Sequence, residues 1–272
     1  MLTAEYLAAS PRRRWLTRTV LIVLLVLAAT AGYAYLIEPN RLQVTRHRMT
    51  GPVREPLKIA HITDLHTQGF GPREQTLVSL VRQQAPDLIV ITGDTVDKGQ
   101  LAPARDLLSN LSAPLGVWIV RGNWERWTLQ EDEKAFYSQL GMRFLVNTGQ
   151  LARDDLWIAG LDDPASGEPD LNKALAGAPT HAFKLVLLHS PDYFDQIAGR
   201  FDLALAGHTH GGQLVVPGLA PFWLPPGGKR YVRGWYSRNG SQLFVSRGIG
   251  TSIIPARLFA RPELAIIEVH PR

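Results

Sequence analysis

The sequence predicts an α/β domain with a parallel sheet, preceded by one N-terminal transmembrane helix. Three observations predict this arrangement. An uncharged apolar segment lies near the N-terminus, β-branched runs bounded by Gly, Pro or Asp alternate with segments of helical periodicity, and polar side chains follow those runs. The chain has 272 residues, of which 45% are hydrophobic, so it is long enough to enclose one large core.

The apolar segment is expected to cross a membrane as a single helix. Residues 19–37 carry no charge and follow a basic flank at residues 1–18, and their length suits the hydrocarbon core of a bilayer. The flanking arginines weakly favour a cytoplasmic N-terminus and an extracytoplasmic domain, with the cytoplasmic face as the alternative. A cleaved twin-arginine signal, suggested by Arg12-Arg-Arg-Trp-Leu16 and Ala29-Thr-Ala31, and a buried helix are the other interpretations.

Residues 38–56 are expected to be a linker, because they carry scattered charge and prolines and show no periodic pattern. The folded domain is then expected to span residues 57–272. Within it, short apolar runs predict strands and two periodic segments predict helices. The predicted strands are 57–63, 87–92, 115–120, 143–146, 156–159, 183–188, 203–206, 243–246 and 264–269, and the predicted helices are 73–85 and 102–111.

Composition restricts the chemistry. The net charge of +5 is explained in part by the basic membrane flank, and no basic block with interleaved aromatics suggests nucleic-acid binding. The chain contains no cysteine, so disulfides and thiolate metal sites are excluded. Any metal must be held by histidine, carboxylate or amide groups.

Such groups follow several of the predicted strands. Asp64 and His66 follow the first, Asp94 follows the second in Gly-Asp-x-x-Asp, and Asn123 follows the third in Gly-Asn-Trp-Glu. His189 follows a later strand in Leu-Leu-His-Ser-Pro, and the next strand leads into Gly207-His-Thr-His-Gly-Gly-Gln213. Each motif alone is ordinary turn chemistry, but the carboxyl ends of parallel strands meet at one edge. Together they favour a divalent transition-metal site of Mn, Zn or Fe.

Taken together, these motifs resemble the calcineurin-like metallophosphoesterase superfamily. The resemblance extends over residues 58–269 and is closest to its membrane-associated bacterial subgroup, through the His189 and Gly207 motifs and Ser246-Arg-Gly-Ile-Gly-Thr-Ser252. It implies a four-layer α/β/β/α sandwich. It also implies a hydrolase of phosphoric ester or pyrophosphate bonds that uses two divalent metal ions and a metal-activated water.

The resemblance also implies a role for each ligand. One metal is assigned to Asp64, His66 and His210, the other to Asn123, His189 and His208, and Asp94 is assigned to both as a bridge. Asp94, Asn123 and His208 are also expected to act in catalysis. Asp97 and His61 are candidates for hydrogen bonds that orient the ligand histidines.

One position departs from the family pattern. Trp124 stands where the family has a histidine that contacts phosphate, and an indole cannot act as a general acid. We therefore expect a preference for pyrophosphate bonds or activated diesters over alkyl phosphates. The alternative is that His181 or Arg126 supplies the missing function from another loop.

The membrane helix suggests a lipid-linked substrate, and the subgroup resembles enzymes that hydrolyse UDP-2,3-diacylglucosamine. That precursor is met on the cytoplasmic face, opposite to the topology that the arginines favour. A general envelope phosphodiesterase and a non-catalytic metal-binding envelope protein are the alternatives, while a nuclease is disfavoured. A monomer is expected. The aromatic, Pro-rich segment 220–232 is interpreted as an ordered loop, with lipid contact as the alternative.

Overall fold

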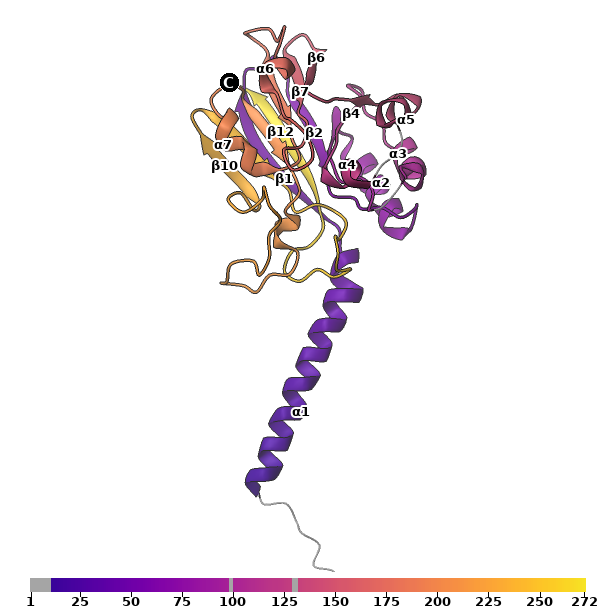
Figure 1. Ribbon diagram of the computed structural model, residues 1–272, viewed down its shortest axis with the longest axis vertical. Coiled ribbons are helices and arrows are strands. Elements are labelled where there is room, and N and C mark those ends of the chain that lie inside the picture. The colour runs from indigo at the N-terminus through magenta and orange to yellow at the C-terminus, as the bar shows by residue number, and fades with distance from the viewer. Residues whose placement is uncertain (1–10, 98–99, 129–131) are drawn as a thin grey trace, which may run out of the picture.

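A long N-terminal helix leads into an α/β domain, as Figure 1 shows for the computed structural model. The structure describes residues 11–97, 100–128 and 132–272. Helix α1 (Pro11–Gly32) continues through a π-helical turn, Tyr33–Ile37, and a 3-10 turn, Glu38–Asn40. Among the described residues, Arg12–Asn40 is the one helix long and apolar enough to cross a membrane, and almost none of its apolar part is buried. A helix is therefore present at the predicted place, and its length and composition suit a membrane span.

The first sheet has the strand order β1-β12-β2-β3-β4-β5 within the described residues. Strands β2, β3, β4 and β5 run parallel, β12 is antiparallel to β2, and β1 is parallel to β12. The strands are β1 (Gln43–Gly51), β2 (Leu57–Ile62), β3 (Leu88–Thr92), β4 (Val117–Val120), β5 (Arg143–Phe144) and β12 (Glu263–Pro271). The helices that follow them are α2 (Pro72–Gln84), a 3-10 turn at Ala102–Ala104, α3 (Arg105–Ser109), α4 (Asn123–Thr128) and α5 (Glu133–Gln139).

The second sheet has the order β10-β11-β9-β8-β7-β6. Its four central strands are parallel, and the edge strands β10 and β6 are antiparallel to their neighbours. The strands are β6 (Thr148–Arg153), β7 (Leu156–Gly160), β8 (Phe183–Leu187), β9 (Leu203–Ala206), β10 (Gly234–Arg238) and β11 (Ser241–Val245). The associated helices are α6 (Leu171–Ala174), α7 (Phe194–Ile197) and 3-10 turns at Pro191–Tyr193 and His210–Gly212.

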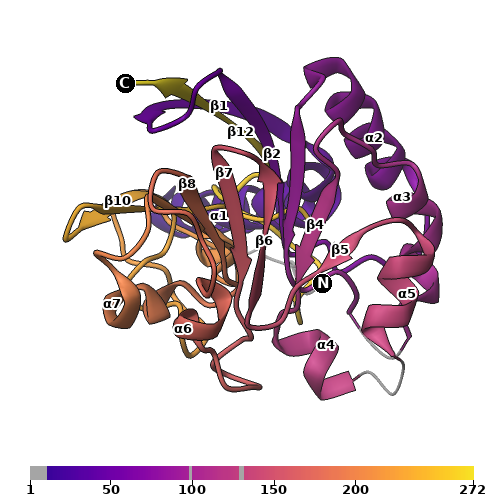
Figure 2. The ribbon, with the colours of Figure 1, turned by 90° about the horizontal axis from the view of Figure 1, so that it is seen from above.

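The two sheets pack face to face between two layers of helices. Figure 2 shows α2, α3 and α5 outside the first sheet and α6 and α7 outside the second. Residues such as Ile59, Val90 and Leu205 fill the space between the sheets and are fully buried. Near-continuous apolar strands of this kind are typical of sheets that are covered on both faces. The expected four-layer sandwich is confirmed.

Helix α2 shows how local sequence sets an element's limits. It begins with Pro72 in the first turn, and Glu74 accepts a hydrogen bond from the backbone N–H of Gly71 at 3.0 Å. It ends where Ala85 adopts a left-handed conformation with φ of 44°. The following proline cannot continue the helix, so α2 delivers the chain directly into β3.

The prediction of a linker at residues 38–56 was wrong. Glu38 is buried, and Gln43–Gly51 forms β1, which pairs in parallel with β12 along its whole length. β1 is an edge strand that alternates half-buried and exposed side chains, so its local pattern is weak. Its partner lies more than two hundred residues away, beyond the reach of local pattern analysis. Edge strands β6 and β10 were also missed. Each pairs with the next strand in the chain, so the reason there is the weak burial pattern of the strand itself.

Candidate metal centre

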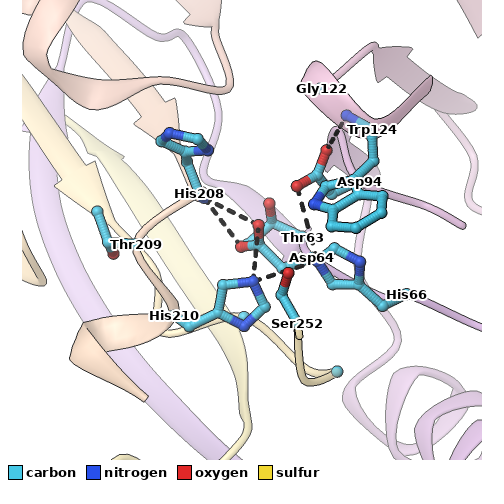
Figure 3. A network of polar contacts seen from close by, with 12 residues as sticks. Thr63, Asp64, His66, Asp94, Gly122, Trp124, His208, Thr209, His210 and Ser252 are labelled. Atoms are coloured by element: carbon cyan, nitrogen blue, oxygen red, sulfur yellow. Dashed lines mark hydrogen bonds and ion pairs between the residues drawn. The ribbon is translucent and has the colours of Figure 1, made fainter. Parts of the chain in front are cut away.

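The predicted ligands come together at the carboxyl ends of the central strands of both sheets. Asp64 follows β2, Asp94 follows β3 and Asn123 begins α4 after β4, while His189 follows β8. His208 and His210 follow β9. All seven are buried. Figure 3 shows the side chains of Asp64, His66 and His210 pointing toward one another, with a dashed line joining Asp94 to the same nitrogen of His66 that faces His210.

The backbone at most of these positions is left-handed. φ is 51° at Asp64, 42° at His66 and 51° at Asp94. It is 72° at His208 and 51° at His210, so five of the eleven described non-glycine residues with positive φ are predicted ligands. This conformation is uncommon outside glycine and costs free energy that the surrounding structure must offset. It turns the chain sharply at each strand end and directs the side chain toward the other predicted ligands.

One group of potential metal ligands consists of Asp64, His66 and His210. Nε2 of His210 lies 3.7 Å from Asp64 Oδ1 and 3.2 Å from His66 Nε2. Burial lowers the pKa of His66 to about 4 and lowers the pKa of His210 well below its ordinary value. Both imidazoles are therefore neutral near pH 7 and keep a lone pair for a metal.

The second group consists of Asp94, His189 and His208, with Asn123 beside it. Nε2 of His189 lies 3.0 Å from Nδ1 of His208 and 3.1 Å from Oδ1 of Asn123. The opposite nitrogens of both rings face backbone oxygens, His189 Nδ1 toward Thr92 at 2.7 Å and His208 Nε2 toward Pro226 at 2.9 Å. This is the arrangement that fixes the tautomer of metal-binding histidines.

Asp94 connects the two groups. Its Oδ2 atom lies 3.2 Å from His189 Nε2 and 3.6 Å from His66 Nε2. Its other oxygen, Oδ1, accepts a hydrogen bond from the backbone N–H of Trp124 at 3.0 Å. One carboxylate oxygen therefore faces both groups, which is the position that a bridging ligand requires.

The charge distribution fits cations at this place. Burial alone would lower the pKa of His189, but Asp94 and, more weakly, Asp64 raise it well above its ordinary value. The same negative field that attracts a proton to His189 attracts a metal ion, and the two compete. Oxygen and imidazole donors in these numbers match the preferences of divalent transition metals. The donor set therefore fits a pair of such ions.

Glu125 organises the Asp94 side of the centre, a role that the sequence analysis did not assign. It is buried, and its carboxylate accepts hydrogen bonds from the backbone N–H groups of Asp94 at 3.0 Å, Thr95 at 2.5 Å and Gly122 at 2.8 Å. It therefore ties the turns after β3 and β4 together. A Cβ on Gly122 would overlap Asp94, so this close approach requires glycine.

Arg257 organises the opposite side and was also missed. Its fully buried guanidinium donates to the backbone oxygens of Gly250 at 2.8 Å, Ala260 at 2.7 Å and Arg247 at 2.9 Å. It also lies 3.3 Å from both the backbone oxygen and Nδ1 of His210. Arg257 thus holds the loop after β11 against the His210 turn. Only its position before a hydrophobic C-terminal strand could have hinted at this, and that signal is weak.

Two expected supporting residues behave differently. Asp97 Oδ1 lies 3.7 Å from His66 Nδ1, close enough for charge attraction but longer than a hydrogen bond. His61 Nε2 contacts Thr92 Oγ1 at 2.8 Å and touches no predicted ligand, although the backbone oxygen of Thr92 faces His189. His61 therefore acts at most through Thr92.

The replacements considered for the missing histidine are separated from the centre or point elsewhere. His181 precedes β8 and contacts Asp154 at 3.3 Å in the turn before β7, so it lies at the opposite end of the second sheet. Arg126 lines a separate hollow with Asp162 and Asn147. Trp124 itself is half-buried, with its ring perpendicular to that of His66 at 5.8 Å between centroids.

Segment 220–232 is ordered, as predicted, and supports the centre from one side. Besides Pro226, which faces His208, its Gly227 oxygen accepts from Asp192 N at 2.8 Å. The Asp192 carboxylate in turn accepts from the backbone N–H groups of Lys229 and Arg230, each at 3.0 Å. The first half of the segment is different, since its large apolar side chains are exposed.

Comparison with known proteins identifies the family. Residues 57–212 match the family model of calcineurin-like phosphoesterases. The chain belongs to this family. It is therefore a metallophosphoesterase, a hydrolase of phosphoric ester bonds in a family that uses divalent metals.

This calcineurin-like phosphoesterase has relatives of similar length in bacteria. It is 31% identical to the uncharacterized metallophosphoesterase YkuE of Bacillus subtilis over 86% of this chain and 88% of that protein. It is 30% identical to the phosphodiesterase YaeI of Escherichia coli over 95% of this chain and 98% of that protein. It is also 30% identical to a transmembrane protein with metallophosphoesterase domain of Bos taurus, over 97% and 64% of the two chains.

Proposed function

We propose that this chain hydrolyses phosphoric diester or pyrophosphate bonds with two divalent metal ions held by seven side chains. The observation that carries the proposal is the convergence of two buried ligand groups on one oxygen of Asp94. The proposed ligands are Asp64, His66 and His210 for one ion, Asn123, His189 and His208 for the other, and Asp94 for both.

The chain's own side chains suit this chemistry. When bound, two divalent ions neutralise phosphate charge, acidify a water and support the leaving oxygen. Asn123 contributes a neutral oxygen beside the carboxylates, which limits the negative charge that an anionic substrate meets. His208 and His189 are oriented by backbone oxygens, so little rearrangement is needed on binding. The mixed donor set favours Mn, Zn or Fe.

Metal-dependent turnover tests the proposal. The full-length protein in detergent is stripped with a chelator, reloaded separately with Mn, Zn or Fe, and assayed on an aryl phosphodiester, a nucleoside diphosphate ester and single-stranded DNA. We expect turnover of the first two with at least one metal. Metal binding without turnover would favour a non-catalytic envelope protein, and cleavage of DNA alone would favour a nuclease.

Trp124 sets the proposed preference for good leaving groups. The indole has no proton to give near pH 7, and general-acid help is typically worth about 100- to 10,000-fold. We therefore expect Trp124→His to raise turnover of an alkyl monoester by about 100-fold, with little change for a pyrophosphate bond. Trp124→Phe is the matched control, because it reduces the size of the ring without adding a group that can donate a proton. Faster cleavage of alkyl monoesters than of diphosphates by the unchanged protein would contradict the preference.

A cleft supports a lipid-linked substrate. It has a volume of about 760 Å³ and extends from Asn40, at the end of the membrane helix segment, to His66 and Asp97 at the metal centre. Phe70 and Ile254 contribute apolar lining, beside polar residues such as Arg73 and Glu74. In the proposal, the phosphate lies beside His66 and the lipid tail contacts Phe70 and Ile254.

The proposed substrate is thus a membrane-lipid phosphate ester or diphosphate, with UDP-diacylglucosamine-type lipids as one example and an extracytoplasmic domain as the proposed topology. We propose that the protein acts as a monomer. Turnover of a lipid diester in vesicles is compared with that of a soluble diester with the same leaving group. We expect Ile254→Asp to raise KM for the lipid only, whereas Leu151→Asp, at the distant strand β6, should change neither. Equal KM values for both substrates in the unchanged protein would favour a general envelope phosphodiesterase.

A further inference from the structure

The exposed apolar side chains of the domain are concentrated in two loops. Among the described residues after Asn40, eight large hydrophobic side chains are exposed, and seven of them lie in segments 213–223 and 251–259. The eighth is Leu151 on β6. Single exposed apolar residues are normal on a protein surface, but a concentration of this kind marks an interaction site. The side chains used in the argument are Leu219, Phe222, Trp223, Ile253, Ile254 and Phe259, which we call the apolar loop surface.

The two loops are fastened to each other. The side chain of Gln213 donates to the backbone oxygens of Ser252 at 3.0 Å and Ile254 at 2.9 Å, and its own oxygen accepts from Ser252 N at 3.0 Å. The backbone of Val215 donates to the Leu258 oxygen at 2.9 Å. The two loops that carry the apolar loop surface are therefore held together by hydrogen bonds near Gln213.

The second of these loops is fastened to the end of the N-terminal helix segment. The backbone N–H of Arg257 donates to the oxygen of Ala34 at 2.9 Å, and Ala260 N donates to the buried Glu38 carboxylate at 2.8 Å. Figure 1 shows both loops at the end of the domain from which α1 leaves. The uncharged segment 19–37 ends at Ile37, so the bilayer surface lies at about the level of these contacts.

Three further observations favour lipid as the covering material. Ile253 has φ of 65°, an unfavourable conformation for a β-branched residue, and its side chain is 74% exposed, so the domain itself gains little from this geometry. Phe222 is 98% exposed beside Trp223, and an exposed aromatic pair is common where protein meets a bilayer interface. Exposed Lys229 and Arg233 lie nearby in sequence and suit anionic headgroups.

We propose that the apolar loop surface is a membrane-docking surface that inserts into the interface of the same bilayer that α1 crosses. The domain would then be attached to the membrane at two places, the helix and the loops, instead of by the helix alone. This inference concerns where the domain lies and needs no turnover. It therefore stands or fails separately from the proposed enzymatic function.

Single-cysteine labelling tests the proposal directly, because the native chain has no cysteine. Full-length Phe222→Cys and Ile253→Cys are labelled with the environment-sensitive fluorophore NBD and reconstituted in phosphatidylcholine vesicles containing a quarter phosphatidylglycerol. Leu151→Cys is the matched control, since Leu151 is also an exposed aliphatic residue but lies on β6. Thermal unfolding checks that each variant is folded. Quenching is measured with lipids that carry bromine near the headgroup end of the acyl chain.

We expect brominated lipid to reduce the emission at positions 222 and 253 by about twofold or more, as for groups buried 5–10 Å into the interface, and to leave position 151 unchanged. Adding Phe222→Asp to Ile253→Cys should reduce the quenching at position 253. Quenching no greater than at position 151 would overturn the proposal. Protection of the labels that depends on protein concentration and not on brominated lipid would overturn it as well, and would point to a second copy of the chain.

Discussion

Asp94 and Asp64 occupy corresponding places at the ends of the neighbouring strands β3 and β2, yet they are supported in different ways. Around Asp94, one buried carboxylate, Glu125, accepts three backbone N–H groups from turns within the first sheet. Around the Asp64 group, one buried guanidinium, Arg257, donates to backbone oxygens of a loop that also contacts the membrane helix. Two similar groups of proposed ligands are thus held in place by supporting side chains of opposite charge. One support acts within the first sheet, and the other acts on a loop beside the N-terminal helix.

Electrostatics distinguish the two aspartates as well. Burial raises the pKa of Asp64 to about 7, and His189 only partly offsets it. For Asp94, burial acts in the same direction, but the neighbouring histidines, His189 foremost, together outweigh it and lower the pKa below the ordinary value. Asp94 is therefore the carboxylate that stays ionised most readily, which suits a ligand shared by two cations.

The largest effect is expected from substituting Asp94, the side chain that the two groups share. Asp94→Asn should lower turnover of an aryl phosphodiester by about 1,000-fold, because the oxygen facing both groups loses its charge and several kcal/mol of charge stabilisation depend on it. Turnover of the reloaded protein under single-turnover conditions measures the effect. Retention of more than about a tenth of the activity would show that Asp94 is not the bridge.

Removing the metals should have the next largest effect, now on stability. Each ion that binds only the folded state at about 100 times its Kd stabilises it by about 2.7 kcal/mol, so two ions contribute about 5.4 kcal/mol. For a domain of this size, chelation of both ions should lower Tm by roughly 10–20 °C. Calorimetry with stepwise return of metal measures it. Two separate steps in the recovery would confirm that the groups differ, whereas a single step would mean that they fill together.

Glu125→Gln tests the Asp94 side alone. The amide can accept fewer of the three backbone N–H groups, and leaving a buried donor unpaired costs about 1–3 kcal/mol. We expect that loss of stability together with about 10- to 100-fold weaker binding of one metal equivalent. Calorimetric metal titration measures the affinity. Asp155→Asn makes the same chemical change at a buried carboxylate that accepts from Arg54 N far from the centre, and it should leave metal binding unchanged.

Arg257→Lys tests the Asp64 side and should have the smallest effect. Lysine keeps the positive charge but cannot reproduce the forked contacts to Gly250, Ala260 and Arg247. We expect about 10-fold weaker binding of one metal equivalent. Arg261→Lys, at a half-buried neighbour, serves as control. Competition between Mn and Zn, monitored by electron paramagnetic resonance, shows which metal equivalent each variant weakens. If Arg257→Lys and Glu125→Gln weakened the same equivalent, the two sides would not be supported separately.

The convergence of the proposed ligands was predictable from sequence because each follows an apolar strand and the parallel arrangement brings strand ends together. The supports were not. Glu125 accepts three backbone N–H groups from two turns, and nothing in its neighbourhood in sequence indicates which N–H groups will be unpaired there. β1 was missed because its pairing with β12 is set by long-range contacts. His181 is an error of the opposite kind, because a residue outside the site was considered as part of it. Its imidazole suits the chemistry, but it lies at the opposite end of the second sheet.

The left-handed turns at the ligands have a consequence for which amino acids these positions accept. After glycine, the residues that tolerate this backbone conformation best are asparagine, aspartate and histidine. These are also residues whose side chains offer oxygen or imidazole nitrogen to a metal. At Asp64, His66, Asp94, His208 and His210, backbone geometry and coordination chemistry therefore select from the same small subset of the amino-acid alphabet. A substitution that fits the left-handed backbone but offers no metal ligand is therefore unfavourable. So is one that offers a ligand but does not fit the backbone.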